Sequence, residues 1–179
     1  MTEPDAASDE MEFEDLLTKT SRTFALSIPR LPEPTRREVT LAYLLFRIAD
    51  TFEDAATWPR AERLQAFAEF GRLLDQNVPE EAARLAAVWA EVVPCAQPGY
   101  RELLVRIPEV LDATYGLAPE ASCLVRAHTR RTLLGMATFV ERMSDAGELD
   151  LVDLPDLQDY CYAVAGIVGE LLTELFLIG

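Results

Sequence analysis

The chain has 179 residues, half of them hydrophobic, which suffices for one domain with a substantial core and is too few for two ordinary domains. Its 16 basic and 31 acidic side chains give a formal net charge of −15. Nucleic-acid-binding surfaces need clustered Lys and Arg, so this acidity argues against a nucleic-acid partner and against a polybasic membrane anchor. One histidine and three widely spaced cysteines argue against a zinc site.

Residues 1–12 are acidic and lack the apolar run of a secretion signal, so we expect an unstructured lead-in to one helical domain over residues 13–179. Unpaired thiols are typical of a reducing compartment, which favours a cytoplasmic location. The most apolar run, 163–179, contains two glutamates and is too short and too charged for a membrane span.

Helical periodicity runs along most of the chain, with prolines at its interruptions and no sustained strand alternation, and this pattern predicts an all-α fold. The predicted helical segments, in chain order, are 13–28, which is helical or partly helical, then 35–55, 59–77, 79–93, 100–115, 119–143 and 155–179. Pro108 either lies early in the fifth helix or kinks it. An acidic loop, 144–153, precedes the last helix.

The predicted helix 35–55 is apolar around most of its circumference, which is typical of a buried helix. Tyr43, Arg47, Asp50 and Asp54 interrupt it at helical spacing, so they share one face, with Glu53 beside them. Buried acids must be paired, protonated or bound to a cation. We expect these acids to open onto a cavity that Tyr43 and Arg47 also line.

Two interpretations of this face stay open from the residues alone. Arg47 neutralises Asp50 in a structural ion pair while Asp54 is solvated, or the acids hold Mg²⁺. The second interpretation suits the chemistry of Mg²⁺, which prefers carboxylate oxygens and commonly bridges them to substrate phosphates.

Upstream, the segment 20–24 reads Thr-Ser-Arg-Thr-Phe and places Arg22 among hydroxyl groups. Such a set either binds a diphosphate or forms a helix N-cap beside a surface arginine. In the last helix, Gly166 and Gly169 predict the close approach of a neighbouring helix or of a bulky apolar ligand. Glu170 and Glu174 form either a second acidic site or an exposed face.

Three segments, 20–24, 43–54 and 160–169, together resemble the N-terminal portion of the squalene/phytoene synthases, the head-to-head trans-prenyltransferases. The stretch 131–141, with Gly-Met-Ala-Thr-Phe, is similar to the helix that precedes the Tyr-Cys motif of that family. The Asp-Thr-x-Glu-Asp form of the middle motif looks closer to squalene synthases than to phytoene synthases.

The resemblance implies an isoprenoid-synthase helical fold around a deep apolar cavity that binds two prenyl diphosphates through Mg²⁺. It implies head-to-head condensation of farnesyl diphosphate to squalene by way of presqualene diphosphate, with NADPH as reductant. The alternatives are a phytoene synthase that acts on geranylgeranyl diphosphate, and a non-catalytic family member that serves as a helical binding partner. The expected further contacts are peripheral contact with a membrane for product release and self-association through apolar helix faces.

The resemblance also assigns roles to residues. Tyr43 and Tyr160 would line the reacting centre. The metal ligands would be Asp50, Glu53 and Asp54. The contacts to substrate or cofactor would be Ser21, Arg22, Arg47 and Val164.

One feature of the family is missing from these 179 residues, namely a second aspartate-rich motif beyond the Tyr-Cys helix, which Glu170 and Glu174 do not match. The expectation is therefore that the sequence is an N-terminal part, that another chain supplies the rest, or that catalysis is lost. With one acidic motif, we expect weak binding of a prenyl diphosphate and no synthase activity from this chain alone.

Overall fold

A computed structural model describes residues 6–21, 23–95, 97–144 and 147–179. Within these ranges every regular element is helical, which confirms the all-α prediction. The elements are α1 (Ala6–Thr20), α2 (Phe24–Ser27), the 3₁₀ turn η1 (Ile28–Arg30), α3 (Thr35–Glu53), α4 (Arg60–Asp75), α5 (Pro79–Val92), α6 (Pro98–Val105), α7 (Ile107–Tyr115), α8 (Pro119–Arg142), α9 (Leu154–Cys161), the π-helical turn η2 (Tyr162–Gly166) and α10 (Ile167–Ile178).

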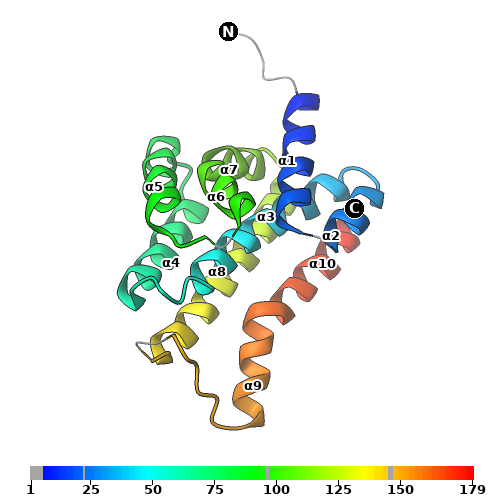
Figure 1. Ribbon diagram of the computed structural model, residues 1–179. Helices are drawn as coiled ribbons and strands as arrows, with labels where there is room; N and C mark the ends of the chain where they lie inside the picture. The colour runs from blue at the N-terminus through cyan, green and yellow to red at the C-terminus, as the bar shows by residue number, and fades with distance from the viewer. Residues whose placement is uncertain (1–5, 22, 96, 145–146) are drawn as a thin grey trace.

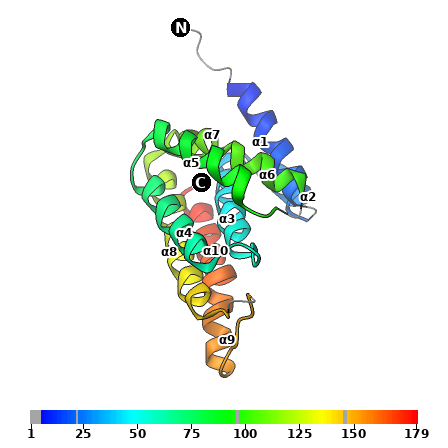
Figure 2. The ribbon, with the colours of Figure 1, turned by 60° about the vertical axis from the view of Figure 1, so that its left-hand side comes forward.

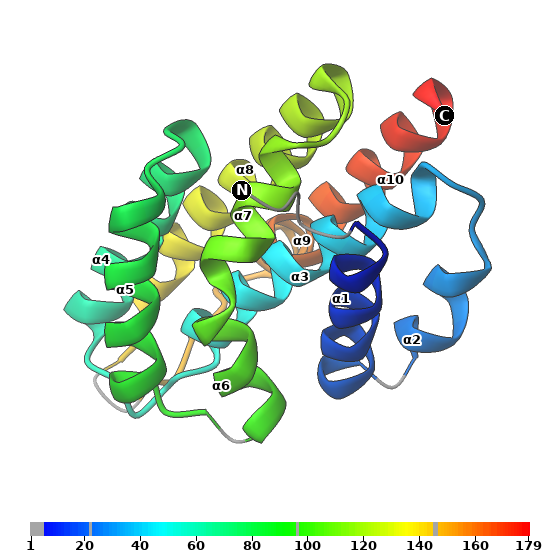
Figure 3. The same cartoon turned by 90° about the horizontal axis from the view of Figure 1, so that it is seen from above.

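Helices α3 and α8 pack against each other at the centre of the molecule (Figure 1). Seen from above, α4 and α5 lie on one side of this pair, and α1, α2 and α10 lie on the other (Figure 3). The central position of α3 follows from its sequence, because an apolar helix is stable only when other elements cover most of its circumference.

Aromatic packing joins the C-terminal end of α3 to α4 and α5. The ring of Phe52 lies 6.2 Å from that of Phe67, 6.1 Å from that of Phe70 and 5.0 Å from that of Trp89, measured between centroids. Arg63 of α4 is 2% exposed and closes the same end of α3. Its Nε donates to the Phe52 carbonyl at 3.1 Å and its Nη2 donates to the Glu53 carbonyl, which satisfies two backbone acceptors that a helix end leaves open.

The N-terminal prediction is wrong for residues 6–12, because α1 begins at Ala6; residues 1–5 lie outside the described residues. Phe13, Leu16 and Leu17 are buried and hold this helix in the core. Arg106, the residue between α6 and α7, pairs with Glu12 of α1 at 2.5 Å and ties α1 to this junction.

Two predicted helices are interrupted in the structure. The helix expected over 13–28 ends at Thr20, and the chain becomes helical again in the short α2 and η1. The helix expected over 100–115 begins at Pro98 and breaks at Arg106, so that Pro108 occupies the first turn of α7. Proline is tolerated there because the first backbone N–H groups of a helix have no intrahelical acceptor.

Helices α9 and α10 follow each other through η2 without a break, and α9 projects beyond the other helices at one end of the molecule (Figure 2). Among the described residues, the stretch Leu154–Ile178, 25 residues long, could cross a membrane by length and composition alone. This stretch is longer than the apolar run 163–179 expected from the sequence, because α9 extends it toward the N-terminus. Only 22% of its most apolar segment is buried; Ile167, Leu171 and Leu175 are among the residues of this stretch that pack against the rest of the domain.

The glycines of these helices differ in their surroundings. A Cβ on Gly135 of α8 would lie 2.7 Å from the Cβ of Ala163 in η2, so this glycine permits the close approach of the two elements. A Cβ on Gly166 would meet the ring of Tyr162 one turn earlier. A Cβ on Gly169 would meet nothing within 4 Å, so the predicted close approach at that residue is not observed.

We therefore expect Gly169→Ala to raise the free energy of unfolding by up to about 1 kcal/mol, because alanine is the better helix former. Gly135→Ala gains the same propensity but forces α8 away from η2, and overpacking costs about 1–3 kcal/mol. Urea unfolding of the two variants should show Gly135→Ala to be the less stable by about that amount. Equal stabilities would contradict the close packing of α8 on η2.

Candidate functional site

The polar face predicted on α3 is present in the structure. From Val39 to Asp54, the side chains that reach solvent are those of Tyr43, Arg47, Asp50 and Asp54, and the other side chains are buried. The face therefore combines an aromatic ring, a cation and two carboxyl groups on a helix whose remaining surface belongs to the core.

Arg47 is the centre of this face. Its Nη1 lies 3.2 Å from Asp50 Oδ2, and its Nε donates to the hydroxyl of Tyr43 at 3.3 Å. The Tyr43 hydroxyl in turn donates to the carbonyl of Thr20 at 2.8 Å, which ties the end of α1 to α3. Burial lowers the pKa of Arg47, but Asp50, Tyr43 and Tyr100 outweigh it, so the pKa lies above its ordinary value and the guanidinium stays charged.

Two cavities meet at Arg47. A largely apolar cavity of about 270 Å³ lies between α3 and α10, and its walls include Tyr43, Asp50 and Val164. A polar cavity of about 390 Å³ lies between the end of α1 and the start of α6, and its walls include Ser21 and Tyr100. Arg47 and Phe24 line both. This arrangement places a cation between a hydrophilic and a hydrophobic compartment.

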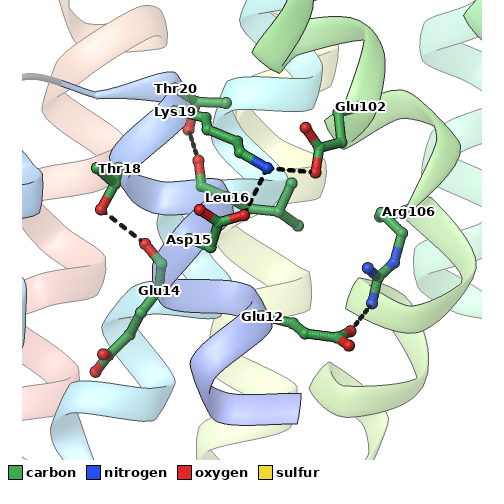
Figure 4. A network of polar contacts seen from close by, with 9 residues as sticks. All are labelled: Glu12, Glu14, Asp15, Leu16, Thr18, Lys19, Thr20, Glu102 and Arg106. Carbon is green, nitrogen blue, oxygen red and sulfur yellow. Dashed lines mark hydrogen bonds and ion pairs between the residues drawn. The ribbon is translucent and has the colours of Figure 1, made fainter. Parts of the chain in front are cut away.

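Ion pairs fix the walls of the polar cavity (Figure 4). Lys19, near the end of α1, lies 2.5 Å from Asp15 and 2.7 Å from Glu102 of α6. A Cβ on Gly99 would lie 2.7 Å from the Lys19 carbonyl oxygen, so the backbones of α1 and α6 are in close contact beside the cavity.

The three acids of the motif lie in different surroundings. Asp50 lines the apolar cavity, but Glu53 and Asp54 are not among its lining residues. Glu53 is 8% exposed and accepts a hydrogen bond at 3.2 Å from the hydroxyl of Tyr160, whereas Asp54 is exposed. Tyr160 therefore contacts the acidic motif rather than the lining of either cavity described above.

The pKa values of Asp50 and Glu53 are raised, chiefly because both carboxyl groups are buried. Burial raises the pKa of Asp50 to about 6; Arg47 opposes this shift and Asp54 adds to it. Burial raises the pKa of Glu53 to about 7, opposed by the hydrogen bond from Tyr160 and reinforced by Asp50 and Asp54. Burial and the nearby acids raise the pKa of Tyr160 to about 12, so it remains a donor.

This donor set fits a divalent cation, because a bound cation would stabilise the ionised carboxylates that burial disfavours. Within the part of the chain that the structure describes, no group of three or more His, Cys, Asp or Glu side chains converges on one metal position. The chain's contribution to a Mg²⁺ site would therefore be one or two carboxylates, with phosphate and water oxygens completing the coordination.

The remaining predicted residues are placed as follows. Val164 lines the apolar cavity and Ser21 the polar one. The Ser21 hydroxyl accepts from the backbone N–H of Phe24 at 2.9 Å, whereas the N-cap residue of α2, Thr23, makes no side-chain capping hydrogen bond. Arg22 lies outside the described residues. Sequence reasoning did not assign Tyr100 to the site, because no motif surrounds it and only the fold brings it to Arg47.

The acids of α10 are engaged with α8. Glu170 pairs with Arg131 at 2.8 Å and accepts from the hydroxyl of Tyr162 at 2.7 Å. Glu174 lies 3.5 Å from Nε2 of His128. These contacts favour a structural role on the surface between α8 and α10 over a second acidic site.

Fold and site together define a helical domain with two adjoining cavities: a cation and hydroxyl groups line the polar one, and mostly apolar side chains line the other. Comparison with known proteins narrows this class. The family model for squalene/phytoene synthase matches residues 17–178, and the chain belongs to that family. The family comprises farnesyl-diphosphate farnesyltransferases, uses prenyl diphosphates and typically depends on Mg²⁺ and NADPH.

Named relatives include a squalene synthase of Botryococcus braunii, 29% identical over 90% of this chain and 31% of its own. Squalene synthase ERG9 of Candida albicans is 30% identical over 92% of this chain and 34% of its own. A solved structure of TcSQS with the ligand BPH1237 superposes with a TM-score of 0.77 at 28% identity, over 96% of this chain and 45% of that chain. The chain thus spans about a third of the curated relatives it matches.

The raised pKa of Glu53 predicts a pH-dependent stability. The folded state holds a proton that the unfolded state releases at lower pH, so stability is present below about pH 4 and declines as pH rises through about 7. In EDTA, urea unfolding should show a decline of up to about 3 kcal/mol between about pH 5 and pH 8.

Glu53→Gln keeps an acceptor for Tyr160 and should remove the part of that decline centred near pH 7, while the raised pKa of Asp50, about 6, leaves a smaller decline at lower pH. Glu91→Gln, at an exposed position on α5, is the matched control and should retain it. If both variants kept the full pH dependence, the burial of a titrating Glu53 would be refuted.

Proposed function

We propose that this chain forms the diphosphate-binding wall of a head-to-head prenyltransferase, and that its substrate is farnesyl diphosphate, condensed to squalene by way of presqualene diphosphate. The observation that carries the proposal is the position of Arg47 at the junction of the polar and apolar cavities. A prenyl diphosphate has the same division, with a charged head and a hydrocarbon tail. The named relatives, which are squalene synthases, support the choice of product.

The residues of the chain account for the binding chemistry. Arg47 would donate hydrogen bonds to diphosphate oxygens, and a guanidinium suits this role because it stays charged and presents several N–H groups in one plane. The apolar side chains between α3 and α10 would hold the prenyl tail, and their burial with it would keep water from the allylic carbon. Tyr43 would hold Arg47 and the end of α1 in register through its hydroxyl group.

Asp50, with Glu53 or Asp54, would hold Mg²⁺, which when bound neutralises the charge that a departing diphosphate develops. For NADPH, the polar cavity offers Arg47 and Ser21 as contacts to a phosphate group. We therefore propose Mg²⁺ for this site, and NADPH if the product is squalene. We also propose the cytoplasm as the location, with peripheral membrane contact for release of the apolar product.

A second function is favoured by a separate observation. Phe176, Leu177 and Leu154 are exposed on the C-terminal helical stretch, and in the described part of the chain a single acidic motif borders the cavity. A non-catalytic member of the family that binds another helical chain would show both features. Product and binding analysis with farnesyl diphosphate, geranylgeranyl diphosphate, Mg²⁺ and NADPH separates the hypotheses: squalene or presqualene diphosphate, or specific binding of farnesyl diphosphate, supports the first proposal, and phytoene supports a phytoene synthase. The absence of both product and diphosphate binding supports the second.

Binding itself is tested by calorimetric titration of the chain with farnesyl diphosphate in the presence of Mg²⁺. Arg47→Met should weaken binding about tenfold or more, because hydrogen bonds to charged groups contribute about 1.5–3 kcal/mol. Arg126→Met is a matched control, since Arg126 also lies over a tyrosine, 4.6 Å from the Tyr115 ring centroid, but lines neither cavity. Wild-type affinity in Arg47→Met, or no binding by the wild-type chain, would overturn the proposal.

A further inference from the structure

Arg47 has partners on its own helix and one aromatic partner from elsewhere in the fold. The guanidinium carbon lies 5.5 Å from the ring centroid of Tyr43 and 5.6 Å from that of Tyr100. Tyr43 and Asp50 belong to α3 and move with Arg47. Tyr100 belongs to the first turn of α6, so its ring relates the guanidinium to a different part of the structure.

The position of Tyr100 is itself fixed. Its neighbour Gly99 touches the Lys19 carbonyl region, as the 2.7 Å distance of a Cβ from that oxygen shows. One turn further, Glu102 pairs with Lys19, and Arg106 pairs with Glu12 (Figure 4). Helix α6 therefore has little freedom to slide along α1, and the half-buried ring of Tyr100 is held at the wall of the polar cavity.

An arginine side chain is long and loses rotamer freedom when it binds an anion. An aromatic ring that already restricts the plane of the guanidinium reduces the loss of rotamer freedom on binding. An arginine within about 6 Å of a tyrosine ring is attracted to it by about 0.5–2 kcal/mol. We propose that Tyr100 is a positioning residue that holds the Arg47 guanidinium at the junction of the two cavities and thereby sets the affinity for the diphosphate head group. This inference rests on the proposed function.

The hydroxyl group of Tyr100 has no part in the proposal, which depends on the ring. Tyr100→Leu should weaken binding of farnesyl diphosphate, measured calorimetrically with Mg²⁺, by about threefold to thirtyfold. Tyr100→Phe retains the ring and should bind within about twofold of the wild-type chain. Tyr115→Leu removes a comparable ring from Arg126, away from both cavities, and controls for the general cost of losing a tyrosine; it should bind like the wild type.

A double-mutant cycle separates positioning from direct contact with the ligand. If Tyr100 acts through Arg47, adding Tyr100→Leu to Arg47→Met should change the affinity by less than about twofold. Additive losses would show that the ring contacts the ligand itself and would overturn the inference. Wild-type affinity in Tyr100→Leu, with Arg47→Met impaired, would also overturn it while leaving the proposed function intact.

An NMR experiment tests the position of the Arg47 side chain without a ligand. The Arg47 Nε–H resonance in the NMR spectrum of the wild-type chain should carry ring-current shifts from Tyr43 and Tyr100; Tyr100→Leu should remove the second contribution and move the resonance, whereas Tyr100→Phe should leave it in place. Its exchange with water should become faster in Tyr100→Leu. An unchanged resonance in Tyr100→Leu would overturn the inference. Loss of binding by the wild-type chain, with the resonance changes as expected, would instead count against the proposed function and show that the positioned arginine serves another anion.

Discussion

The ion pair between Arg47 and Asp50 lies in an otherwise apolar helix, and the rest of the site depends on how its charges are met. A half-buried pair stabilises a protein only when its remaining donors and acceptors find partners. Asp50 and Tyr43 engage part of the guanidinium, and the Tyr43 hydroxyl donates a hydrogen bond to the Thr20 carbonyl. Arg47 lines both cavities, so the packing that buries α3 leaves its charge at their junction.

The acidic end of α3 has a different imbalance. Arg63 is the nearest buried cation, yet its Nε and Nη2 donate to backbone carbonyls of α3, where they complete the helix end. Its charge opposes the raised pKa of Glu53 but ranks behind burial and the neighbouring acids among the influences on that group. The carboxyl group of Glu53, with a pKa of about 7, is thus partly protonated near neutral pH. A cation that binds there would displace protons, which couples its affinity to pH.

The sequence was informative where a pattern has a single physical cause. Apolar residues around α3 with polar residues at helical spacing predicted both the burial of the helix and the face that reaches solvent. The sequence was less informative where tertiary contacts decide. Acidic residues 6–12 suggested an unstructured lead-in, but the buried Phe13 and Leu16 anchor the helix that includes them. Gly169 suggested close packing, which occurs instead at Gly135. Tyr100 lies far from Arg47 along the chain, and only the contact of α6 with α1 brings the two together.

The C-terminal helical stretch contributes to the candidate site and also carries exposed apolar side chains. One side of α10 closes the apolar cavity through Leu171 and Leu172, while Phe176 and Leu177 remain exposed. A helix that is apolar on both sides is typical of a position between two layers, and the matched solved structure extends well beyond the part that this chain covers. In this structure the apolar cavity is therefore lined in part by a helix whose outer face is exposed at Phe176 and Leu177, whereas Arg47 is held by contacts from both α3 and α6. If a prenyl diphosphate binds here as proposed, the cation that would meet its head group is already positioned by contacts within this chain.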